Sequence, residues 1–128
     1  MLKYLLLIGF GSFLGGIARF IVTRVIQNSA STSFPLGTLS VNIIGCFLIG
    51  IIFGLSERST LINNELRMFL TIGFCGGFTT FSSFTNENIL LLRDGNIMYF
   101  ALYTSISVFI GIFATYAGNL LTKILSPM

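Results

Sequence analysis

Four long apolar stretches alternate with short polar ones along the 128 residues of the chain. The apolar stretches cover about residues 2–26, 36–55, 67–92 and 97–125. A helix needs about 20 mainly apolar residues to cross a bilayer, and each stretch is long enough. The connections contain turn-forming and polar residues, namely QNSASTSFP, SERSTLINNE and RDGN. This pattern predicts four transmembrane helices joined by short loops.

Composition supports a membrane protein and leaves no room for a soluble domain. Hydrophobic residues make up 54% of the chain and charged residues only 9%, against about 25% charged in a typical soluble domain. The opening MLKYLLLIGF resembles a signal peptide, but its apolar run continues toward Ile26, which is too long for the apolar core of a typical signal peptide. We therefore expect an all-α protein with a single transmembrane domain over residues 1–128.

Several classes of function are disfavoured by what the chain contains. There is no His, and Cys46 and Cys75 lie in apolar surroundings without the spacing of metal ligands. The net charge of +3 is spread out, whereas nucleic-acid binding favours a clustered basic face. No nucleotide-binding loop or catalytic dyad is recognisable, and no carboxylate falls clearly in the middle of a span. We therefore expect neither an enzyme nor a nucleic-acid-binding protein.

The third apolar stretch contains an unusual run, GFCGGFTTFSSF, from Gly73 to Phe84. Irregular backbone at membrane depth is tolerated only where protein buries it or where it lines a wet cavity. Gly76 and Gly77 weaken the helix there, and the hydroxyl residues that follow can satisfy freed backbone groups. Two interpretations stay open, a glycine kink without a ligand and an interrupted helix that binds an ion.

Two phenylalanines and an asparagine are candidates for contact with an anion. Phe81 and Phe84 are three residues apart and share a helix face, and the edge of an aromatic ring is partially positive. Asn42 lies within the second stretch, where its amide offers two donors. Packing phenylalanines and an asparagine hydrogen-bonded between helices are the alternatives.

The fourth stretch carries a stripe of small and hydroxyl-bearing residues on one helix face. Its members are Thr104, Ser107, Gly111, Thr115, Gly118 and Thr122. Tyr103 lies one turn before Ser107 and adds a further hydroxyl. Such a stripe serves either close helix packing or the wall of a polar track. Arg19, near the end of the first stretch, either extends to the interface or concentrates anions at a pore mouth.

The basic residues show almost no bias between the two sides of a four-span layout. Lys3, Arg58, Arg67 and Lys123 fall on one side, and Arg19, Arg24 and Arg93 on the other. Since the bias of Lys and Arg sets orientation, such a chain can insert both ways up. We therefore expect an antiparallel, dual-topology homodimer, because four helices alone make a poor pore.

Three blocks of the sequence resemble the signature blocks of the Fluc family of microbial fluoride channels, also called CrcB proteins. They are GGIARF (Gly15 to Phe20), GTLSVNIIGCFLIG (Gly37 to Gly50) and GFCGGFTTFSSF (Gly73 to Phe84). The resemblance covers essentially the whole chain in length, four-span layout and order of the blocks. The third block is highly specific, the second supports it, and the fourth span is the least constrained match.

The resemblance implies an antiparallel dimer with two parallel fluoride pathways and a third helix broken in mid-membrane. It implies that Phe81 and Phe84 line the pore with their ring edges and that Asn42 faces the ion. It also implies hydroxyl groups along the pathway at Ser82, Ser83, Tyr103 and Thr115. We add Ser107, which belongs to the stripe on the fourth stretch.

The resemblance further implies a structural sodium ion at the dimer centre, held by backbone carbonyls of Gly76 and Thr79 from each subunit. Arg19 resembles the arginine of the aqueous vestibule. The expected function is passive export of fluoride through a multi-pass protein of the bacterial plasma (inner) membrane, which protects the cell from fluoride toxicity. The expected partners are fluoride, sodium, membrane lipid and a second copy of the chain.

Two other classes of protein share parts of this pattern. A small dual-topology multidrug exporter fits the length and the charge balance, but it needs a membrane-embedded carboxylate early in the chain, and residues 2–26 contain none. A scaffold subunit without transport activity would leave the hydroxyl cluster of the third stretch and the stripe of the fourth without a role.

Overall fold

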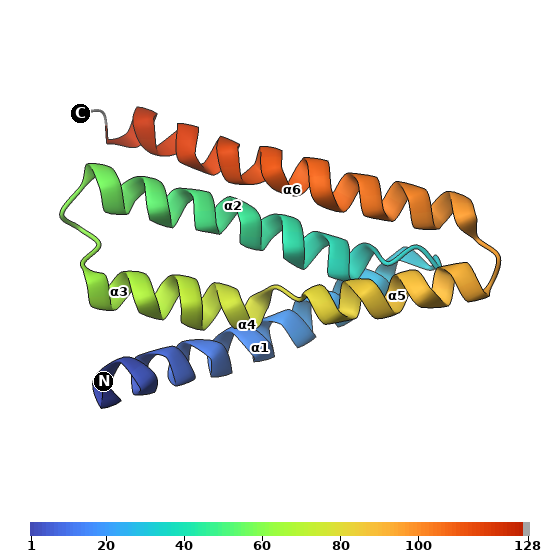
Figure 1. The fold of residues 1–128 in the computed structure, drawn as a ribbon, viewed down its shortest axis with the longest axis horizontal. Coiled ribbons are helices and arrows are strands. Elements are labelled where there is room, and N and C mark those ends of the chain that lie inside the picture. Colours follow the sequence, from blue (N-terminus) through green and yellow to red (C-terminus); the bar gives the residue numbers. More distant parts are fainter. Residues whose placement is uncertain (127–128) are drawn as a thin grey trace.

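The computed structural model describes residues 1–126, and all its regular elements are helices. In Figure 1, residues 36–58, the segment 64–93 and residues 97–125 lie side by side, and the N-terminal helix crosses them obliquely. In chain order the elements are α1 (Leu2–Ala30), α2 (Leu36–Arg58), α3 (Asn64–Met68), the π-helix η1 (Phe69–Cys75), α4 (Gly76–Phe78), α5 (Phe81–Arg93) and α6 (Ile97–Leu125).

Three of the predicted spans are single continuous helices. Within residues 1–126, only α1, α2 and α6 are long and apolar enough to cross a membrane. Their first residues agree with the expected ones, whereas α1 and α2 continue four and three residues beyond the expected ends. The third expected span, residues 67–92, is assembled from α3, η1, α4 and α5, all of them shorter than a membrane-spanning helix. A total of four spans therefore stays a prediction.

Glycines bring the long helices into backbone contact, as expected for packing in lipid. A Cβ on Gly50 of α2 would collide with the carbonyl oxygen of Thr115, and one on Gly118 of α6 with that of Phe47. On the other side of the molecule, a Cβ on Gly11 of α1 would lie 2.6 Å from the carbonyl oxygen of Phe69. At these contacts glycine therefore serves close packing of the helices.

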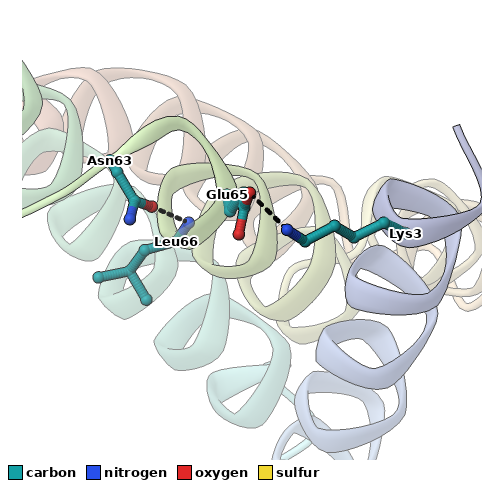
Figure 2. A network of polar contacts seen from close by, with 4 residues as sticks. All are labelled: Lys3, Asn63, Glu65 and Leu66. Carbon is teal, nitrogen blue, oxygen red and sulfur yellow. Dashed lines mark hydrogen bonds and ion pairs between the residues drawn. The ribbon is translucent and has the colours of Figure 1, made fainter.

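The start of α3 is held by a small polar network, which Figure 2 shows from close by. The Asn63 side chain accepts a hydrogen bond of 2.8 Å from the backbone N–H of Leu66 and so caps the helix. Lys3 Nζ lies 2.8 Å from Glu65 Oε1, which joins the first turn of α1 to that of α3. Both charged side chains are largely exposed, so this ion pair contributes little to stability.

The helical backbone is interrupted between α4 and α5 at two threonines. Thr79 and Thr80 are extended, with φ, ψ values of −92°, 160° and −152°, 122°. The expectation that Gly76 and Gly77 form the weak point is wrong in position, because Gly76 is helical (φ −61°, ψ −37°) and α4 contains both glycines. Gly77 instead allows contact with α1, since a Cβ there would lie 2.6 Å from the carbonyl oxygen of Ser12.

Candidate functional site

The interruption is held in place by one side chain of α2. Asn42 Nδ2 donates a 3.0 Å hydrogen bond to the carbonyl of Thr80, and Asn42 Oδ1 accepts a 2.8 Å bond from the N–H of Thr80. A primary amide thus pairs with the extended peptide and satisfies the polar groups that the helix has released. The interhelical hydrogen bond expected as one alternative for Asn42 is present, and one amide hydrogen of Asn42 takes no part in these two bonds.

A pocket of about 270 Å³ lies beside this contact. Three of the expected pathway residues line it, Asn42, Phe81 and Thr115, together with Thr79, which is expected at the sodium site. The remaining lining residues are Gly45, Cys46, Ile49 and Thr80. None of these side chains carries a full charge at neutral pH, so the pocket offers an ion neutral polar groups and one aromatic ring.

Threonine and serine hydroxyls complete the hydrogen bonding at both ends of the interruption. Thr79 Oγ1 donates to the carbonyl of Cys75 over 3.0 Å, so it closes the last turn of α4. Thr80 Oγ1 accepts a 3.2 Å bond from the N–H of Ser83 and caps α5. The Oγ of Ser82, an exposed residue in the first turn of α5, lies 3.4 Å from Thr80 Oγ1.

The interruption also releases backbone carbonyls at the end of α4. In a continuous α-helix the carbonyl of Gly76 would accept from the N–H of Thr80 and that of Thr79 from the N–H of Ser83. These two N–H groups instead bond to Asn42 Oδ1 and to Thr80 Oγ1. Gly76 and Thr79, the expected sodium ligands, are therefore positions whose carbonyls have lost their helical donors.

The carbonyl of Gly77, between those two, is occupied. Arg19 Nε donates a 3.0 Å hydrogen bond to it from α1. Arg19 is partly buried, and its expected place in an aqueous vestibule stays a prediction. Its guanidinium places a positive charge at the carbonyl end of α4, where a helix terminus favours one.

The two candidate phenylalanines lie together but in different surroundings. Their ring centroids are 5.7 Å apart, so the expectation that they share a face is confirmed. The side chain of Phe81 is 76% exposed, whereas Phe84 packs against the buried Tyr103 at 5.0 Å between centroids. Phe81 therefore presents an exposed ring beside the pocket, and Phe84 connects it to the core between α5 and α6.

Behind Phe84, a carboxylate accepts hydrogen bonds from two buried hydroxyls. Tyr103 Oη donates to Glu87 Oε1 over 2.9 Å, and Thr38 Oγ1 donates to Glu87 Oε2 over 2.8 Å. Sequence reasoning placed Tyr103 on the track but did not connect it with Glu87 or Thr38. Glu87 lies three residues after Phe84 on the same helix face, which is the one local signal that could have found it.

The stripe on α6 divides into packing and polar positions. Gly118 and Thr122 are buried against α2, whereas Thr115 Oγ1 donates to the carbonyls of Cys46 and Gly111 over 3.0 and 3.2 Å. Ser107 Oγ is buried and has no hydrogen-bond partner among residues 1–126. An unpaired buried hydroxyl is costly, so Ser107 is a position where an ion or a water would relieve an unmet donor.

One edge of the interruption is left uncovered by the rest of the chain. The exposed residues on this edge are Ile72, Gly76, Phe81, Ser82, Thr85 and Asn86. It mixes an apolar side chain, an open aromatic ring, released backbone and polar groups. Such a surface suits neither lipid, which cannot pair the polar groups, nor water.

Relatives of the chain are found among named membrane proteins. The chain is 52% identical over 120 residues to a fluoride-specific ion channel FluC of Chlorobium phaeobacteroides (strain BS1), covering 94% of this chain and 93% of that protein. It is 44% identical over 122 residues to a protein of the same name from Flavobacterium psychrophilum, covering 95% and 98%. A third protein of that name, from Phocaeicola vulgatus, is 46% identical over 117 residues, covering 91% and 96%.

The family that matches is described as CrcB-like protein, Camphor Resistance (CrcB), and it matches residues 6–119. The match includes the interruption, the pocket beside it and most of the three long apolar helices. With these helices, the chain is a multi-pass bacterial membrane protein that belongs to the CrcB-like family.

Proposed function

We propose that the chain is a fluoride-selective channel that exports the ion passively down its electrochemical gradient. The observation that carries this proposal is the uncharged pocket at the interruption, where Asn42, Thr115 and the exposed ring of Phe81 meet. The names of the relatives, fluoride-specific ion channel FluC, support the choice of ion.

The chemistry of the pocket suits a small anion that must enter and leave quickly. Fluoride is strongly hydrated, so several donors have to replace the water that it loses. In the pocket, a spare amide hydrogen of Asn42 and the ring of Phe81 each offer a moderate attraction, and the unpaired hydroxyl of Ser107 lies outside the pocket lining. Conduction requires binding that is favourable enough for entry and weak enough for release, which neutral groups provide better than a lysine would.

The direct test is ion flux through purified protein reconstituted in liposomes. A fluoride electrode should report rapid fluoride efflux once the membrane potential is shunted, and a chloride electrode should report almost none. Chloride flux equal to fluoride flux would contradict the proposed selectivity. Growth of a fluoride-sensitive bacterial strain with and without the gene would test the protective role. The membrane potential drives each fluoride ion out of the cell with about 2.3 kcal/mol per 100 mV.

We propose further that two copies assemble in opposite orientations around two pathways. The support is the uncovered edge at Gly76 and Phe81, which a second copy would bury, and the near-equal distribution of Lys and Arg between the two sides. α3, η1, α4 and α5 would together form the third span of each copy, which brings the total to four. A cysteine near the C-terminus should react with an impermeant reagent from both faces of the membrane, and labelling from one face alone would contradict dual topology.

The released carbonyls fit the proposed structural sodium ion. Na⁺ is a hard cation that prefers oxygen ligands, and Gly76 and Thr79 supply carbonyl oxygens without helical partners. Two copies would provide four such oxygens at the dimer centre. A bound sodium ion would supply a fixed positive charge near the anion route. Sodium-dependent thermal stabilisation of the purified protein would test this site, and its absence would contradict it.

A further inference from the structure

Four consecutive backbone carbonyls at the interruption have lost their helical N–H donors, and one of them accepts a hydrogen bond from a side chain instead. The helical donors to Gly76, Gly77, Phe78 and Thr79 would be the N–H groups of residues 80–83. The extended backbone of Thr79 and Thr80 separates these donors from α4. Among the four carbonyls, that of Gly77 accepts a side-chain hydrogen bond, from Arg19 Nε at 3.0 Å.

The sequence and packing of α1 make this contact possible. Gly77 approaches α1 so closely that a Cβ on it would lie 2.6 Å from Ser12 O and 3.1 Å from the N–H nitrogen of Gly16. Arg19 follows Gly16 by three residues and therefore lies on the same helix face, one turn further along. The glycine contact thus fixes the distance over which the guanidinium reaches the carbonyl.

From this geometry we propose that Arg19 is a positioning residue for the cation site at the interruption. By bonding to Gly77, it removes one of these four carbonyls from the set of available ligands and leaves those of Gly76, Phe78 and Thr79, among them the two expected cation ligands. This inference rests on the proposed sodium site and adds a residue that determines its selectivity. Cation selectivity in carbonyl sites depends on the number and stiffness of the coordinating oxygens, and Arg19 controls both.

Three substitutions separate the hydrogen bond from the charge. In Arg19→Gln, the amide nitrogen lies as many bonds from Cα as Nε does, so the donor remains while the charge is lost. Arg19→Met removes donor and charge at similar size. Arg19→Lys keeps the charge but places a methylene where Nε lies. Arg24→Met is the matched control, because Arg24 lies over the Phe20 ring at 5.3 Å, an arrangement that leaves the interruption untouched.

The measurement is the thermal unfolding of purified full-length protein in detergent, titrated with sodium or potassium chloride at constant ionic strength. A cation that binds only the folded state raises the melting temperature in proportion to its affinity. The potassium concentration at the midpoint of its titration, divided by the sodium concentration at the midpoint of its own, gives the preference for sodium over potassium. We expect it to fall about tenfold in Arg19→Met and in Arg19→Lys, as for one lost hydrogen bond from a charged donor, and to stay near the wild-type value in Arg19→Gln and Arg24→Met.

Each other outcome overturns the inference in a recognisable way. An unchanged preference in Arg19→Met would show that the bond to Gly77 does not select ligands. A loss in Arg19→Gln as large as in Arg19→Met would assign the effect to charge alone. If Arg19→Met does not yield folded protein, Arg19→Lys replaces it, and a wild-type preference there has the same meaning. A wild-type protein that conducts fluoride but shows no response to sodium would refute the cation site and leave the channel proposal standing.

Discussion

Asn42 and Thr80 are 38 residues apart in the sequence, and they exchange two hydrogen bonds in the structure, one in each direction. The side chain of α2 thereby takes the place of the peptide that a continuous helix would have offered to Thr80. Only a primary amide presents a donor and an acceptor in this arrangement. The local shape of the interruption therefore depends on the chemical identity of residue 42, not only on its size.

We expect Asn42→Asp to suppress fluoride flux strongly. The carboxylate cannot donate to the carbonyl of Thr80, it repels that carbonyl, and it adds a negative charge to the pocket wall. Leaving a buried acceptor unpaired costs about 1–3 kcal/mol, so the unfolding free energy should fall as well. Liposome flux and denaturation in detergent would measure the two effects.

Asn64→Asp, at the exposed start of α3, is the control for an added charge and should leave both quantities unchanged. Asn42→Asp protein that is folded and conducts like the wild type would show that Asn42 lies off the ion path and that the contact with Thr80 is dispensable.

Phe81→Ile and Phe84→Ile should both reduce flux but differ in their effect on stability. Loss of about 1.4 kcal/mol of stabilisation at the highest barrier to the ion lowers the rate about tenfold, and we expect at least that decrease in each variant. Because Phe84 packs on Tyr103, its replacement should also lower the unfolding free energy by about 1 kcal/mol. Phe81 is 76% exposed, so its replacement should leave the stability of the monomer unchanged.

Phe109→Ile, on the exposed face of α6, serves as the control for both phenylalanine variants, and flux is measured in liposomes at equal protein density. Wild-type flux in both Phe81→Ile and Phe84→Ile would show that the two rings serve only packing.

Thr80→Val should destabilise the start of α5, because valine has nearly the shape of threonine but cannot accept from the N–H of Ser83. Loss of a helix N-cap costs about 1 kcal/mol. Thr80→Ser keeps the acceptor and should retain most of the stability. Hydrogen exchange of the first-turn amides of α5 would locate the effect, and equal protection in both variants would argue against the cap.

Gly15→Ala should disrupt the contact between α1 and the segment formed by η1 and α4, whereas Gly16→Ala should be tolerated. A Cβ on Gly15 would collide with the carbonyl oxygen of Phe74, but one on Gly16 meets nothing within 4 Å. Overpacking costs about 1–3 kcal/mol, and replacing a helical glycine without a clash gains about 0.4–1 kcal/mol. Denaturation of the two variants in parallel would test this, and equal stabilities would mean that α1 shifts to accept the methyl group.

The extent of the long helices could be predicted from sequence because it depends on a local quantity. Uninterrupted apolar composition marks α1, α2 and α6, and their first residues agree with the expected Leu2, Leu36 and Ile97. The interruption of the third stretch was also recognisable from its composition. Its position was misjudged by three residues, because Gly76 and Gly77 were taken as the weak point although glycine also permits close helix contact.

The contacts that define the site could not be read from local patterns. Asn42 meets Thr80, Arg19 meets Gly77, and Tyr103 meets Glu87 across distances of 16 to 58 residues in the sequence. Each contact depends on how far one helix is rotated against another, which hydrophobic periodicity does not determine in a helix surrounded by lipid. The π-helical turn in residues 69–75 is likewise invisible to composition.

The contact between Asn42 and Thr80 joins two amide groups, and neither gains or loses a proton in mildly acidic or alkaline surroundings. These two hydrogen bonds are therefore insensitive to pH over that range. Fluoride crosses lipid as the uncharged acid HF, so it accumulates inside a cell most rapidly when the medium is acidic. The contact between Asn42 and Thr80 would therefore keep its two hydrogen bonds in the acidic medium from which a cell takes up the most fluoride.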